Sequence, residues 1–77
     1  MPRYFFHVRA NDGLVEDPEG TECADEGSIR EEAIEGARQL MAEHIRKGVD
    51  VSDWSYEIVN EHDRPVMTVA FSQAIRR

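Results

Sequence analysis

The sequence contains little of several residue types and segments that would indicate a particular class of protein. Its 77 residues include one cysteine, three prolines and only nine lysine or arginine side chains. One cysteine excludes an intramolecular disulfide, and a small domain without disulfides is typical of a reducing compartment. No apolar run is long enough to cross a bilayer, and the patch near the start is too short for a signal-peptide core. We therefore expect a cytoplasmic protein with no membrane partner.

Positive charge is scarcest between residues 10 and 37. This stretch holds ten acidic side chains and a single basic one, Arg30, in a chain whose net charge is −7. Such a surface repels phosphate backbones, because nucleic-acid binding depends on lysine and arginine releasing counterions. The charge pattern excludes nucleic acid as the expected partner and favours a basic protein.

Catalytic and metal-binding motifs are also missing. His7, His44 and His62 match no zinc-ligand spacing, and no nucleophile elbow, phosphate-binding loop or EF-hand is present. We therefore assign no catalytic, cofactor-binding or metal-ligating residue. His44 falls on an apolar helix face, where a half-buried histidine bonded to a carbonyl is expected, and Cys23 is expected to pack as a small apolar side chain.

What the sequence does contain is clear hydrophobic periodicity. Apolar residues recur every three to four positions between Ser28 and Lys47, which predicts an amphipathic helix. Ser28 and Glu31 form a capping-box pattern at its start, and Gly48 supplies the stop. Gly36 lies at the edge of the apolar stripe, where a close approach to the sheet would explain it.

Alternation predicts strands on both sides of this helix. Before it, 3–9 and 14–16 form a hairpin around an Asp-Gly turn, and 21–23 continue in extended form. After it, 54–59 and 66–71 form a second hairpin, and Ser72 starts a last short turn over 73–77. Residues 1–77 thus predict a single α+β domain of ββαββ order, with one amphipathic helix packed on one face of a three- to four-stranded antiparallel sheet.

The two faces of this sheet are expected to differ. The residues expected in the core against the helix are Tyr4, Phe6, Val8, Trp54, Tyr56, Ile58, Met67, Val69 and Phe71. The opposite face carries Phe5, His7, Val59, Val66, Thr68 and Ala70, which is less polar than a solvated face should be. We predict a protein-interaction face of Phe5, His7, Val59, Val66, Thr68 and, if it projects outward, Trp54. A homodimer that stacks two such faces or joins sheet edges would use it.

Nearly the whole chain resembles a bacterial family of small proteins of unknown function. The features that carry the resemblance are the opening 1–8, the Asp-Gly turn, the segment 16–22, Arg30 with Glu32-Ala33, then Trp54, Val59 and Glu61, and the closing 68–72. The first two-thirds also resembles, more weakly, the N-terminal part of HicB-type antitoxins. The matching positions there are Pro18, Gly20, Cys23, Gly27, Ser28, Glu31, Glu32 and Ala33, but the C-terminal DNA-binding module of those proteins has no counterpart here.

Three hypotheses about function follow from these observations. The first is a non-catalytic interaction or accessory protein that offers its acidic surface to a basic partner. The second is an antitoxin-like inhibitor of a small basic protein. The third is an enzyme or weak metal-binding protein that uses His7, His44 or the acidic turns, and it requires at least two of these groups to lie close together.

Overall fold

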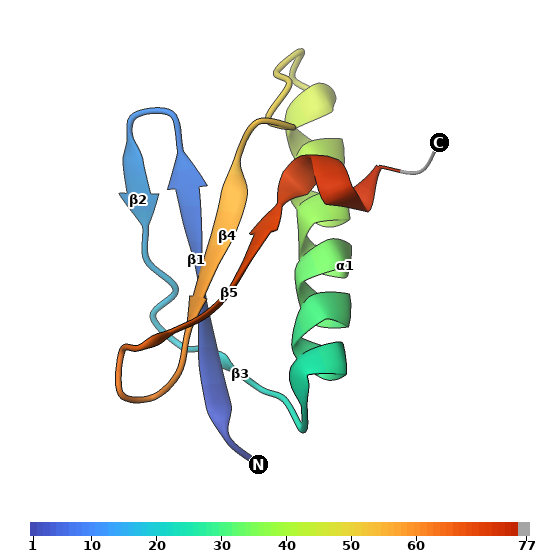
Figure 1. The fold of residues 1–77 in the computed structure, drawn as a ribbon. Helices are drawn as coiled ribbons and strands as arrows, with labels where there is room; N and C mark the ends of the chain where they lie inside the picture. Colours follow the sequence, from blue (N-terminus) through green and yellow to red (C-terminus); the bar gives the residue numbers. More distant parts are fainter. Residues whose placement is uncertain (76–77) are drawn as a thin grey trace.

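The computed structural model describes residues 1–75 of the chain. The elements in order are β1 (Arg3–Ala10), β2 (Gly13–Val15), β3 (Thr21–Glu22), α1 (Glu26–Ile45), β4 (Ser55–Val59), β5 (Pro65–Ala70) and the 3₁₀ helix η1 (Phe71–Ala74). All strand pairs are antiparallel, and α1 is the one long helix beside the sheet (Figure 1). The predicted α+β class and strand–helix–strand order are confirmed.

The sheet has five strands because one of its edge strands is split in two. The strand order is β2-β1-β4-β5, and β3 pairs with the N-terminal end of β1. Val8 lies opposite Val15 in β2, whereas Tyr4 lies opposite Thr21 in β3. The segment between β2 and β3 leaves the sheet in a turn, so the two extended pieces predicted at 14–16 and 21–23 pair with β1 as separate short strands.

The helix begins earlier than the sequence predicted. Its N-cap is Asp25, whose carboxylate accepts a hydrogen bond from the Ser28 backbone N–H at 2.8 Å. Ser28 therefore lies inside the first turn, and the predicted capping box with Glu31 is wrong, because the aspartate already fills the capping role. This bond also holds the pKa of Asp25 below its usual value.

The helix ends at Ile45, and Gly48 follows in the terminating turn as the predicted stop. The Gly48 N–H donates to Ile45 O and the Val49 N–H donates to His44 O, both at 2.9 Å. Gly48 has a φ of +81°, and this pair of bonds with a left-handed residue is the Schellman motif. The chain then turns back toward β4.

The predicted core is confirmed. Phe6, Tyr56, Ile58, Val69 and Phe71 are buried between the sheet and α1, and the remaining predicted core residues pack partly buried against them. Trp54 is among these half-buried residues, 6.2 Å from Phe71 between ring centroids. The sequence analysis did not place Val51 and Ala74 in the core, where the structure buries both.

The end of the described chain differs from expectation. Phe71 to Ala74 form η1, which has no side-chain cap, so Ser72 lies inside this turn instead of starting it. The predicted turn over 73–77 extends past the described residues, and the pair Arg76-Arg77 lies wholly outside them. Phe71 is fully buried because η1 folds it against Trp54 and Tyr56.

Gly36 allows the helix to touch the sheet, as its position on the stripe suggested. A Cβ at this position would lie 2.5 Å from the Tyr56 hydroxyl oxygen, inside van der Waals contact. Tyr56 cannot easily move aside, because its ring is buried and packs on Phe6 and Phe71. The close approach therefore outweighs the helix propensity that alanine would add, about 1 kcal/mol.

A double-mutant cycle tests this contact. We expect Gly36→Ala to lower the free energy of unfolding by about 1–2 kcal/mol, since overpacking exceeds the propensity gain. In a Tyr56→Phe background, where the hydroxyl is absent, Gly36→Ala should lower the free energy of unfolding by a clearly smaller amount. Urea unfolding of the four proteins measures the coupling, and equal costs in both backgrounds would contradict the contact.

Candidate functional site

Asp17 fills the gap between β2 and β3. Its carboxylate accepts a hydrogen bond from the Phe6 N–H at 3.1 Å and from the Glu19 and Gly20 N–H groups at 3.2 Å. The Phe6 N–H points toward this edge of β1, where no neighbouring strand offers a carbonyl to accept its hydrogen bond. Asp17 therefore replaces the missing strand and holds the turn that follows.

The backbone of Asp17 also positions His7. The Asp17 N–H donates to His7 Nδ1 at 3.0 Å, so this ring nitrogen acts as an acceptor and carries no proton. The imidazole lies beside the Phe5 ring, with centroids 6.5 Å apart. The sequence placed His7 on the outer sheet face, and the structure adds that it is bonded to the edge turn.

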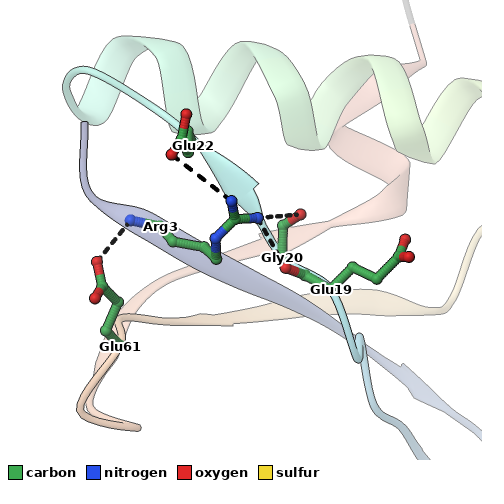
Figure 2. A network of polar contacts seen from close by, with 5 residues as sticks. All are labelled: Arg3, Glu19, Gly20, Glu22 and Glu61. Carbon is green, nitrogen blue, oxygen red and sulfur yellow. Dashed lines mark hydrogen bonds and ion pairs between the residues drawn. The ribbon is translucent and has the colours of Figure 1, made fainter.

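Arg3 ties the same turn to the rest of the molecule (Figure 2). Its Nη1 donates to the carbonyls of Glu19 at 2.9 Å and Gly20 at 3.3 Å, and its Nη2 lies 3.6 Å from the Glu22 carboxylate. Its backbone N–H donates to Glu61 Oε1 at 2.9 Å, which links β1 to the turn between β4 and β5. One arginine thus connects four segments of the chain.

A groove of about 370 Å³ runs between this edge and the helix. Its apolar lining comes mainly from Phe6, Val8, Val15 and Tyr56. Glu16 and Asp17 on the sheet side and Glu32 on α1 also line it, with Gly36 where the helix approaches the sheet. Burial raises the pKa of the Tyr56 phenol, and the carboxylates of Glu32 and Asp17 raise it further.

The acidic side chains around the groove are mostly uncompensated. Of the ten acidic residues between positions 10 and 37, only Glu22 forms an ion pair among the described residues, with Arg3. The other ion pair joins Arg9 to Glu57 on the outer face at 2.8 Å, which lowers the pKa of Glu57. The groove therefore combines an apolar lining with a negative rim.

The predicted interaction face is divided by the structure. Phe5, His7 and Val59 lie together in an outer-face hollow of about 310 Å³, which Asn60, Glu61 and Asp63 also line. Thr68 lies opposite Glu57 on the neighbouring strand and is exposed.

Val66 and Trp54, the other members of this set, pack partly buried against the core. Val66 departs from simple alternation because the β4–β5 register shifts by one residue beside Val59. The hollow and the groove share Glu16, Asp17 and Pro18, so the edge turn separates two adjoining depressions.

The remaining candidate side chains lie apart from the groove. His44 donates from Nδ1–H to Leu40 O at 2.8 Å and packs on Trp54, as a half-buried histidine bonded to a carbonyl. Cys23 is buried, and burial raises the pKa of its thiol. His62 is exposed in the β4–β5 turn. Within residues 1–75 no three histidine, cysteine or acidic side chains are grouped so that they could hold a metal ion.

Sequence reasoning missed the groove. It recognised the acidic stretch 10–37, but gave no reason for Glu16, Glu32 and Tyr56 to meet. The residue that could have indicated the groove from the sequence is Gly36, because a glycine on the apolar stripe marks the point where helix and sheet approach closely.

The fold and groove define a small α+β domain with an acidic, half-apolar edge. Residues 3–72 match the family described as Domain of unknown function (DUF6894), and the chain belongs to this family. No curated protein and no solved structure matches the chain, so the resemblance to HicB-type antitoxins gains no support. In the described part of the chain, no helix has the length and apolar character needed to cross a membrane.

Proposed function

We propose that this protein is a non-catalytic binding module that acts in the cytoplasm and accepts a basic, partly apolar segment of a protein partner in the groove between α1 and the β2–β3 edge. The observation that carries the proposal is an apolar lining next to the carboxylates of Glu16 and Glu32, which form no ion pair within residues 1–75. Cys23 is a free and buried cysteine, and free thiols are typical of proteins in the reducing environment of the cytoplasm.

The chemistry of the groove favours a lysine or arginine segment. An aliphatic stem can pack on Val8, Val15 and Tyr56 while its charged head reaches the carboxylates at the rim. The hydrogen-bonded carboxylate of Asp17 holds the turn in place, so that side of the groove is formed before binding. The net charge of −7 would also steer a basic partner toward the protein.

A peptide titration tests the proposal. We expect the peptide acetyl-Arg-Leu-Lys-Leu-Arg-amide to shift the amide resonances of Val8, Val15 and Tyr56, and its affinity to fall about tenfold or more between 50 and 500 mM salt, as the charges are screened. The matched peptide acetyl-Glu-Leu-Glu-Leu-Glu-amide should not bind. Equal binding of both peptides, or shifts elsewhere only, would refute the proposal.

Charge-reversal variants locate the site. Glu32→Lys lies at the groove and should weaken binding of the basic peptide by about tenfold, roughly 1.4 kcal/mol. Glu43→Lys makes the same change on an exposed helix position that does not line the groove, and it should weaken binding much less. Equal weakening would mean that overall charge, and not the groove, attracts the peptide.

A further inference from the structure

The two edges of the sheet differ in how well they are protected against pairing with a strand of another molecule. The β2–β3 edge is short, split by the turn at Asp17 and lined by acidic residues including Glu16, Glu19 and Glu22. The β5 edge is a strand of six residues, Pro65–Ala70, in which no residue is charged. Unprotected edge strands pair readily with further strands, and proteins usually block them with charge, proline or breaks.

Hydrogen bonding shows which backbone groups of β5 are free. The Phe71 N–H donates to Trp54 O at 2.9 Å, and the register continues with Val69 opposite Tyr56 and Met67 opposite Ile58. Because antiparallel bonding alternates along a strand, Met67 and Val69 bond to β4, whereas the N–H and C=O groups of Thr68 and Ala70 point away from it. Among the described residues, no turn, loop or side-chain hydrogen bond reaches the Thr68 groups or the Ala70 N–H. The Ala70 C=O is already used, because Ala70 is the N-cap of η1 and its carbonyl accepts the first hydrogen bond of that turn.

We propose that a second copy of this chain adds across β5, pairing β5 with β5 in antiparallel register to form a symmetric dimer. Thr68 would face Thr68 of the partner subunit, because in this register the outward N–H and C=O groups of the two Thr68 residues bond to each other. The inference rests on the strand edge alone and is independent of the groove.

β5 is the edge at which a second copy meets the least charge repulsion. A net charge of −7 on each chain would repel a copy over most of the surface. The acidic stretch 10–37 lies on the turns and strands of the far edge and on α1, whereas β5 is separated from that edge by β1 and β4 (Figure 1). The strand is neutral at every position, so a symmetric pair brings no like charges directly opposite each other.

The blocked far edge limits the assembly to two copies. Growth beyond a dimer would need the β2–β3 edge, where the turn at Asp17 interrupts the strand and carboxylates repel. A symmetric pair uses β5 of both copies and leaves no free β5 behind.

Hydrogen exchange and sedimentation together test this proposal on the full chain. We expect a mass of about twice 8.8 kDa at high micromolar concentration. The Thr68 and Ala70 amides should exchange more slowly as concentration rises, while the Met67 and Val69 amides stay protected throughout because they bond to β4. A monomer at millimolar concentration, or a dimer with freely exchanging Thr68 and Ala70 amides, would overturn it.

Two proline variants give a matched comparison. Thr68→Pro removes a donor that the monomer does not use, and two hydrogen bonds across the pair are lost, so the dimer dissociation constant should rise about thirtyfold. Leu14→Pro makes the same change in β2, at the residue between the β1-bonded Gly13 and Val15, and should leave dimerisation unchanged. Thr68→Lys, which keeps the backbone donor, should weaken the dimer about threefold if Thr68→Pro fails to fold. An equal response of Thr68→Pro and Leu14→Pro, or undiminished association of Thr68→Lys, would refute the interface.

Discussion

Replacing Gly20 with alanine is expected to lower the free energy of unfolding by about 2–4 kcal/mol. Gly20 has a φ of +73°, which alanine adopts only with strain. A Cβ would also lie 2.8 Å from Tyr4 O and 2.9 Å from Arg3 Cγ. The backbone contact cannot be relieved by a rotamer change, so β3 would have to separate from β1.

Gly48→Ala provides the control for backbone strain. Gly48 has a similar φ of +81°, but a Cβ there would meet no atom within 4 Å. Gly48→Ala should therefore lower the free energy of unfolding only by the cost of placing alanine at a positive φ, about 1 kcal/mol. Urea unfolding of both variants separates strain from close approach. Equal losses would show that the contact with Tyr4 O is relieved at no cost.

Asp17→Ala is expected to lower the free energy of unfolding by about 2–3 kcal/mol. The change removes three acceptor contacts and leaves the Phe6 N–H without its partner at the split edge. It should also release the turn that lines both the groove and the outer-face hollow. Thermal or urea unfolding measures the loss, and amide exchange at Phe6 reports the local opening.

Asp17→Asn is the matched variant. Its amide keeps one oxygen, which can still accept from the Glu19 and Gly20 N–H groups, whereas its NH₂ group cannot accept from Phe6. We expect an intermediate stability together with fast exchange of the Phe6 amide. Wild-type exchange at Phe6 in both variants would show that the Asp17 carboxylate does not serve as the substitute for a strand.

Much of the candidate site could not be read from spacing. The acidic turn at 16–19 was visible in the sequence, but its meeting with Glu32 and Tyr56 depends on how the helix lies across the sheet. The same holds for Val66, where alternation predicted the outer face and a one-residue register shift placed the side chain against the core. Local periodicity cannot show a bulge, because the extra residue is set by pairing with another strand.

The sequence by itself determined the fold class, the helix stop at Gly48, the core residues of the strands and the carbonyl-bonded state of His44. These depend on short-range periodicity and turn chemistry, which act within a few residues. Only the tertiary structure decided where the helix begins, that the Asp17 carboxylate takes the place of a strand beside Phe6, and which edge stays open. Those outcomes depend on hydrogen bonds between residues far apart in the chain, such as Phe6 with Asp17 and Arg3 with Glu61, and partners of that kind are selected only when the strands come together.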